Sequence, residues 1–294
     1  MTSAETDRAR ALIALILGAC AIAFAPIFVR LTGAGPAATG FWRLLLALPA
    51  LTFMTALARS GERGGRFRPT AGALLAGVFF ALDLGFWHYG IKFTTVADAT
   101  ILANLSPVFV TVGAWLLLSE RPGRLFVAGL ALALGGAWAI AAGHGAAAGP
   151  ARGLGDGLSI ATAVWYAAYM LVVRRARAGQ SASALMLWSS AMGALLLLSA
   201  ALALKEPILP ASPGGWAACV GLATVHVAGQ GAITWALGRL EAAVASVIIL
   251  AQPVLAAVLG WIIFSEPMGP LQIAGGVIAL AGVGLAQAST RKRP

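Results

Sequence analysis

Two charged residues lie deep inside apolar runs of this sequence, and they are the first candidates for chemistry. Asp83 lies near the middle of the run 70–91, and Arg43 lies within the run 36–57. An ionisable group in apolar surroundings is costly and is usually paired or used for transport. Asp83 is therefore a candidate for binding a substrate amine or for proton coupling, and a structural ion pair with Arg43 is an equally supported alternative.

A polar stripe runs along the apolar segment 214–236. His226, Gln230 and Thr234 follow one another at four-residue spacing, which places their side chains on one face of a helix. Lipid would exclude such a face, so it must meet other helices or line a cavity. Histidine is the side chain whose charge changes most readily near neutral pH, so His226 is also a candidate for proton coupling. Interhelical hydrogen bonding without a transport role is the alternative.

Aromatic side chains supply a second kind of candidate. Trp165 and Tyr169 lie four residues apart in the middle of the run 154–174, too deep to be anchors at its ends. They predict a stacking platform for a planar ligand or a cation–π surface for an ammonium group, with plain helix packing as the alternative. Phe28 in the first run and His88 in the run 70–91 are further candidates for substrate contact. His88 lies near the end of its run, where anchoring also explains an aromatic residue.

Two prolines lie inside long apolar runs and are accompanied by polar side chains. Pro107 follows Asn104 in the run 95–117, and Pro253 follows Gln252 in the run 241–263. Each proline removes a backbone donor, so we predict a kink at both positions. A gating hinge at each proline is a hypothesis, and Asn104 and Gln252 are candidate substrate contacts beside it.

The composition indicates what kind of protein must position these residues. Of the 294 residues, 60% are hydrophobic and only 10% are charged, and the mean hydropathy is +0.89. Soluble domains carry about 25% charged residues, so a soluble enzyme, a secreted disulfide scaffold and a disordered chain are excluded. Runs of about 20 apolar residues suffice to cross a bilayer. They predict an all-α membrane protein with ten transmembrane helices at 11–31, 36–57, 70–91, 95–117, 124–143, 154–174, 183–204, 214–236, 241–263 and 270–288.

The distribution of basic residues predicts the orientation of these helices. The net charge is +10, but most Lys and Arg residues flank apolar runs, where they act as topology signals rather than as a nucleic-acid surface. With a cytoplasmic N-terminus, fifteen of them face the cytoplasm and four face the other side. We therefore expect a multi-pass protein of the bacterial inner membrane with both termini in the cytoplasm and no nucleic-acid partner.

An internal repeat is the most informative feature of the chain. A shift of 146 residues aligns 94–140 with 240–286 without a gap. The matches include Pro107 with Pro253, Trp115 with Trp261, and Ser119–Glu120 with Ser265–Glu266. Each repeat, 1–147 and 148–294, holds five predicted spans, an odd number, so the second copy must be inverted in the membrane. Glycines in the fifth and tenth spans predict close helix packing and no transport role.

These matched segments resemble the EamA family of the drug/metabolite transporter superfamily. The likeness is carried by Leu105-Ser106-Pro107 through Glu120-Arg121-Pro122 and by Ala251-Gln252-Pro253 through Glu266-Pro267, and it covers essentially the whole chain. Within that family the chain is most similar to bacterial exporters of aromatic amino acids. The resemblance implies a basket-like bundle in which spans one, three, four, six, eight and nine line a central cavity. It therefore favours cavity lining for His226 and Gln230.

The expected function is transport rather than catalysis. The sequence has no HExxH, GxSxG or P-loop motif, so we expect no enzyme activity, cofactor or metal, and any coupling must use an ion or substrate gradient. The resemblance implies export of amino acids, chiefly aromatic and other hydrophobic ones, and of related small metabolites by alternating access. Efflux of lipophilic or cationic drugs is the alternative in the same class, and a non-transporting scaffold or receptor is the alternative in another. The expected state is a monomer in contact with the lipid bilayer and a small-molecule substrate.

Overall fold

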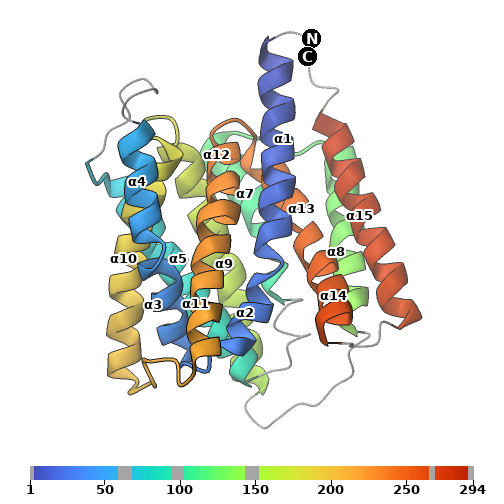
Figure 1. The fold of residues 1–294 in the computed structure, drawn as a ribbon. Helices are drawn as coiled ribbons and strands as arrows, with labels where there is room; N and C mark the ends of the chain where they lie inside the picture. Colours follow the sequence, from blue (N-terminus) through green and yellow to red (C-terminus); the bar gives the residue numbers. More distant parts are fainter. Residues whose placement is uncertain (1–2, 59–67, 94–101, 143–151, 265–268, 291–294) are drawn as a thin grey trace. The chain divides into compact units, whose positions relative to one another are not determined.

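The computed structural model describes residues 3–58, 68–93, 102–142, 152–264 and 269–290, and their regular structure is helical throughout (Figure 1). Each predicted span is mainly helical where it falls in these ranges, which confirms the all-α class. Among the described residues, six helical stretches are long and apolar enough to cross a membrane. They are Thr6–Leu31, Pro36–Leu57, Ala71–Gly90, Gly153–Ala176, Ala182–Ala203 and Pro213–Leu237. The total of ten crossings stays a prediction.

Two compact units divide the chain, and neither follows a single sequence repeat. Unit 1 comprises Met1–Gly85 and Ala168–Leu240, and unit 2 comprises Phe86–Ala167 and Glu241–Pro294. Each unit takes residues from both halves of the chain, and helices α5 (Ala71–Phe93) and α9 (Arg152–Ala176) contribute to both units. The repeat boundary between residues 147 and 148 divides the sequence, and it stays a prediction.

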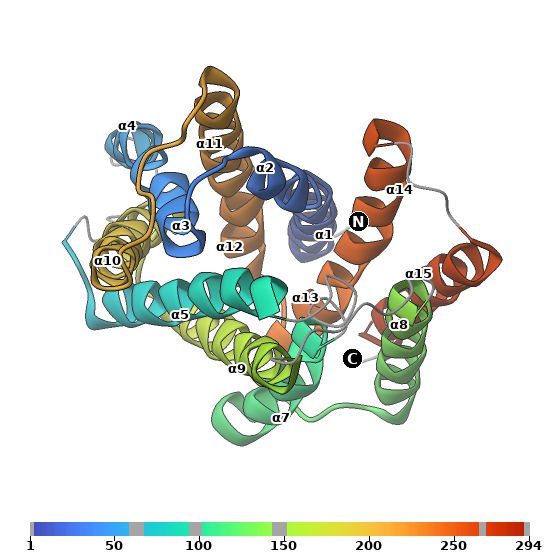
Figure 2. The same cartoon turned by 90° about the horizontal axis from the view of Figure 1, so that it is seen from below.

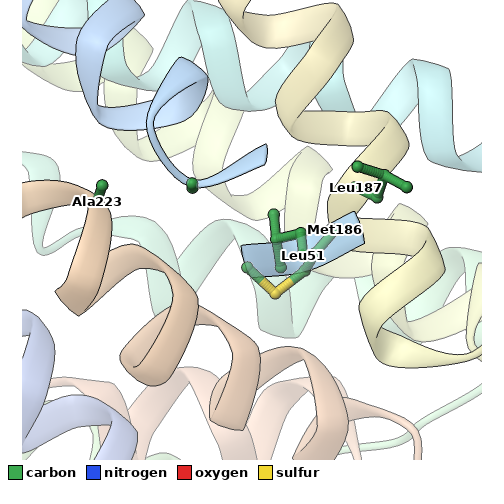
Figure 3. Close-up of a cluster of buried hydrophobic side chains, with 5 residues drawn as sticks. Leu51, Met186, Leu187 and Ala223 are labelled. Atoms are coloured by element: carbon green, nitrogen blue, oxygen red, sulfur yellow. The ribbon is translucent and has the colours of Figure 1, made fainter. Parts of the chain in front are cut away.

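Unit 1 is built around the pairing of the second and seventh predicted spans. Besides its parts of α5 and α9, it contains α1 (Ser3–Ile22), α2 (Ala25–Leu31), α3 (Pro36–Leu45), α4 (Leu48–Ala58), α10 (Ala182–Ala203), α11 (Pro213–Val225), the π-helix η1 (His226–Gln230) and α12 (Gly231–Leu237). Helices α3 and α4 pack against α10 (Figure 2). Ala47, Leu51, Met186 and Leu187 form a buried apolar cluster here, together with Ala223 of α11 (Figure 3).

Prolines explain where the long spans break. The helical residues end at Ile22 before Pro26, at Leu45 before Pro49, at Ala103 before Pro107 and at Ile249 before Pro253. In every case the helix ends four residues before the proline, because the proline ring clashes with the carbonyl group at that position and offers no N–H to it. The helix is thus interrupted before both Pro107 and Pro253, and a gating hinge at either position stays a hypothesis.

In unit 2, glycines allow two helices to pack closely against each other. Besides its parts of α5 and α9, its described helices are α7 (Ser106–Leu118), α8 (Arg124–Ala142), α13 (Ala242–Ile249), α14 (Ala251–Phe264) and α15 (Pro270–Thr290). Helices α8 and α15 run side by side in Figures 1 and 2. A Cβ atom on Gly129 would lie 2.8 Å from the carbonyl oxygen of Gly282, and one on Gly136 would lie 2.5 Å from that of Gly275. The prediction of close packing through these glycines is confirmed.

The same glycines show that the matched helices α8 and α15 run in opposite directions. The 146-residue shift matches Gly129 with Gly275 and Gly136 with Gly282, yet in space Gly129 faces Gly282 and Gly136 faces Gly275. Two equivalent helices pair in this crossed way when a two-fold axis perpendicular to them relates one to the other. It is the arrangement expected of inverted repeats.

Candidate functional site

Four elements of unit 1 bring most of the predicted polar candidates into one buried cluster. Helix α3 carries Arg43, α5 carries Asp83, α9 carries Tyr169, and the π-helix carries His226 and Gln230 at its two ends. Arg43 and Asp83 are 4% and 9% exposed, and Tyr169, His226 and Gln230 are only 1–2% exposed. We call these five residues, together with Ser190 and Thr234, the polar cluster.

The charged members of the polar cluster interact with one another and with an aromatic ring. Arg43 lies within electrostatic range of the Asp83 carboxyl group, and also of Tyr169 and His226. The guanidinium carbon of Arg43 lies 5.8 Å from the centre of the Phe80 ring, which is within the range of a cation–π contact. The cluster therefore holds a basic and an acidic side chain in a buried setting, within electrostatic range of each other.

Tyr169 is enclosed by the polar cluster. The side-chain nitrogen Nε2 of Gln230 donates a hydrogen bond to the Tyr169 hydroxyl at 3.2 Å, and the hydroxyl of Thr234 lies 3.5 Å from it. The centre of the Phe80 ring is 4.8 Å from that of Tyr169. Gln230 and Thr234 thus face α9 as the polar stripe predicts, and the hydroxyl of Tyr169 already has partners within the protein.

His226 is held from two sides at the start of the π-helix. Its Nε2 atom lies 2.9 Å from the hydroxyl oxygen of Ser190 on α10. Its ring stacks on that of Phe80, with 5.3 Å between the ring centres and 23° between the planes. A π-helical turn inside an α-helical span is rare and is frequently found at functional sites. Sequence reasoning did not select Phe80 or Ser190 and did not predict the π-helix.

The polar cluster lies where the two repeats differ. The 146-residue shift matches most of its members to apolar or small residues in the other repeat. The pairs are Arg43 with Ser189, Asp83 with Gly229, Leu44 with Ser190, Phe80 with His226 and Leu84 with Gln230. The fold therefore accepts a side chain of another kind at each of these positions. A comparison of the two repeats at these positions could have identified Ser190 and Phe80 as candidates from the sequence.

Phe80 and His226 are also in direct contact, although they occupy the same position in the two repeats. A residue and its equivalent can touch only where the axis that relates them passes between them. In unit 1 the Phe80–His226 stack therefore marks that axis. Both residues lie close to the middle of their spans, Ala71–Gly90 and Pro213–Leu237.

The remaining predicted contact residues pack against other neighbours. In unit 1, Phe28 on α2 packs its ring against Gly221 of α11, where an added Cβ atom would lie 2.8 Å from the ring. In unit 2, the Trp165 ring lies edge-on to Phe86 at 6.2 Å, and buried His88 lies beside the ring of Trp87 at 5.2 Å.

Two further candidates of unit 2 flank the helix breaks. Asn104 lies in the turn that precedes α7, and Gln252 lies in the first turn of α14. The amide nitrogens of both side chains are buried and have no hydrogen-bond partner among the described residues. Unused donors of this kind are suited to a ligand with acceptor atoms.

The matched Ser–Glu pair has a structural role that sequence reasoning missed. Ser119 ends α7 in a left-handed conformation with φ of 59°. The Glu120 carboxylate accepts a hydrogen bond of 3.1 Å from the backbone N–H of Ala242, at the start of α13. Glu120 therefore caps a helix far away in the sequence. The matched pair Ser265–Glu266 lies outside the described residues.

Comparisons with known proteins agree with a transport role. The pseudopaline exporter of Pseudomonas aeruginosa is 27% identical over 219 residues, which cover 74% of this chain and 75% of the exporter. A protein of Streptantibioticus cattleyicolor named as a probable terminal-alkyne amino-acid exporter is 28% identical over 284 residues, 93% of this chain and 91% of that protein. A protein of known crystal structure shares the fold, with a TM-score of 0.78, 19% identity and coverage of 96% of this chain and 99% of its own.

The sequence profile of the EamA-like transporter family matches the chain twice, at residues 9–142 and 153–287. Each match covers most of one half of the chain. The two matches together account for nearly all of the described helices. The chain is a member of the EamA-like transporter family.

Proposed function

We propose that this protein exports amino acids, chiefly aromatic and other hydrophobic ones, and related small metabolites by alternating access. Two relatives that match most of the chain are named as exporters, and one of these names specifies an amino acid. Membership of a transporter family supports movement of a small molecule across the membrane. The substrate class and the binding site rest on the arguments that follow.

The observation that carries this proposal is the difference between the repeats at the polar cluster. A buried charge pair and buried hydrogen-bonding groups are costly inside a membrane protein. If the fold required them, the matching positions of the other repeat would need them too, yet those positions hold residues such as Leu44, Leu84 and Gly229. The polar groups are therefore retained for binding or coupling.

The chemistry of the polar cluster suits a zwitterion. Arg43 supplies donors for a carboxylate, and Asp83 supplies acceptors for an ammonium group, so a bound amino acid would compensate both charges. The ring of Phe80 lies beside Arg43, Tyr169 and His226 and offers an apolar surface next to these polar groups. Such a site would bind the carboxylate and the ammonium group of an amino acid and would offer an apolar surface to its side chain. It therefore favours amino acids with hydrophobic side chains.

The place of the polar cluster along its helices also suits transport. Inverted repeats are related by an axis in the membrane plane, and transporters of this kind bind substrate near the midplane. The Phe80–His226 stack lies on such an axis in unit 1. A site at that depth can be opened to either side of the membrane by movement at the breaks before Pro107 and Pro253, which is the gating hypothesis for these residues.

The test of this proposal is uptake of labelled amino acids into liposomes that contain the purified protein. L-phenylalanine, L-tryptophan, L-leucine, L-lysine and a labelled lipophilic cation are supplied with and without a proton gradient. We expect saturable transport of the first three and acceleration by the gradient if Asp83 or His226 couples protons. If the protein transports the lipophilic cation but no amino acid, the proposed amino-acid export is wrong and drug efflux is the better assignment. Absence of transport for every solute would favour a scaffold or receptor.

A further inference from the structure

Ser190 and His226 form a pair that is isolated from other hydrogen-bonding groups. The Ser190 hydroxyl is completely buried, and its hydrogen bond to Nε2 of His226 is its only one among the described residues. The other ring nitrogen of His226, Nδ1, is also buried and has no hydrogen-bond partner in the same part of the chain. The ring is thus bonded at one nitrogen and open for bonding at the other.

We infer that Ser190 is a positioning residue that fixes the orientation and tautomer of His226, so that Nδ1 is presented to the substrate. This inference rests on the proposed function, because it assigns a partner to a residue of the proposed site. A neutral imidazole carries one donor and one acceptor, and the hydrogen bond at one nitrogen decides the role of the other. The Ser190 hydroxyl proton has no other acceptor among the described residues, so we take it as donated to Nε2, and Nδ1 then carries the ring proton and acts as a donor.

The remaining surroundings of His226 hold the ring in place without competing for Nδ1. The stack on Phe80 fixes the plane of the ring. Arg43 on α3 lies within electrostatic range of His226, and Asp83 on α5 and Tyr169 on α9 are in range of Arg43. Helix α1, which packs against the π-helix, brings Gly18 and the apolar Ile22 to Gly229.

A role in packing alone does not account for Ser190. The matched position in the first repeat is Leu44, a completely buried apolar residue in the same helix pair. The hydroxyl of the neighbouring Ser189 donates a hydrogen bond to the backbone carbonyl of Met186 in its own helix, at 3.2 Å. Ser190 instead directs its hydroxyl to a side chain on another span.

The first readout is the tautomer of His226 in the purified full-length protein. The chain has only three histidines, so a sample labelled with ¹⁵N-histidine gives few signals, and His226→Gln identifies the relevant one. We expect one dominant tautomer in the wild type, a mixture in Ser190→Ala, and a return to one tautomer in Ser190→Thr, which keeps the hydroxyl. The control Ser189→Ala should match the wild type.

The second readout is transport of L-phenylalanine in liposomes. Loss of one oriented hydrogen bond predicts a rise in KM of about threefold to tenfold in Ser190→Ala, with kcat little changed and recovery in Ser190→Thr. Unchanged ¹⁵N signals in Ser190→Ala, or an equal rise in KM for Ser189→Ala, would overturn the inference. If the wild type moves no amino acid, the proposed function fails, and the tautomer measurement still decides whether Ser190 orients the ring.

Discussion

The imidazole ring of His226 stacks on the ring of Phe80, the residue that occupies the same position in the first repeat. The same position of the repeat thus holds an apolar ring in the first half of the chain and a hydrogen-bonding ring in the second half. The two rings are in contact because the axis that relates the repeats passes between them. The two repeats differ from each other in the polar residues around this stack.

The contact between α8 and α15 predicts a strong difference between two adjacent glycines. A side chain at Gly136 would overlap the backbone of α15, whereas Gly135 has no atom within 4 Å of an added Cβ. Gly136→Val should lower the free energy of unfolding by at least about 1–3 kcal/mol through overpacking, and Gly135→Val should change it little. Thermal unfolding in detergent measures both. Equal melting temperatures for the two variants would contradict the described contact.

The cap on α13 predicts a graded loss of stability. Glu120→Ala removes the acceptor for the Ala242 N–H and should cost about 0.5–2 kcal/mol, while Glu120→Gln keeps an acceptor oxygen and should cost less. Glu241→Gln is the control, because Glu241 occupies the cap position without a capping side-chain bond. Hydrogen exchange of the first turn of α13 reports the effect directly. Faster exchange in Glu241→Gln than in Glu120→Ala would refute the assignment.

The position of Trp165 predicts a change of selectivity. Trp165 on α9 lies edge-on to Phe86 of α5. The aromatic platform predicted at Trp165 should favour substrates with planar side chains. Trp165→Ala is expected to raise the KM for L-phenylalanine by about threefold to tenfold and to leave that for L-leucine nearly unchanged. Trp138→Ala, which removes an exposed tryptophan of α8, is the control. An equal effect on both amino acids would assign Trp165 to packing.

Much of the fold could be predicted because membrane helices leave strong signals. Apolar runs gave the helical segments, and the matched glycines predicted the close contact that Gly129 and Gly282 make. The positions of the breaks followed from proline chemistry at Pro107 and Pro253. The division into two compact units was not predictable in the same way, because it depends on contacts between segments that lie far apart in the sequence.

The sequence indicated most residues of the polar cluster, but neither Ser190 nor the neighbouring Phe80. His226, Gln230 and Asp83 stand out in the sequence because polar groups are rare in apolar runs. Phe80 has no such signal, since one more aromatic residue in an apolar helix is unremarkable, and a serine like Ser190 most often bonds its own helix. The π-helix at His226–Gln230 has no residue pattern that would predict it.

The charge pair of the polar cluster provides the most direct test of the central claim. Asp83→Leu alone removes the acidic group that lies within electrostatic range of the buried Arg43 and should cost about 3–5 kcal/mol of stability. The double variant Arg43→Leu/Asp83→Leu removes both charges and should recover the melting temperature. The decisive measurement is uptake of L-phenylalanine by this double variant in liposomes. Wild-type stability with transport abolished is the predicted result, and transport at the wild-type rate would show that the pair only supports the fold.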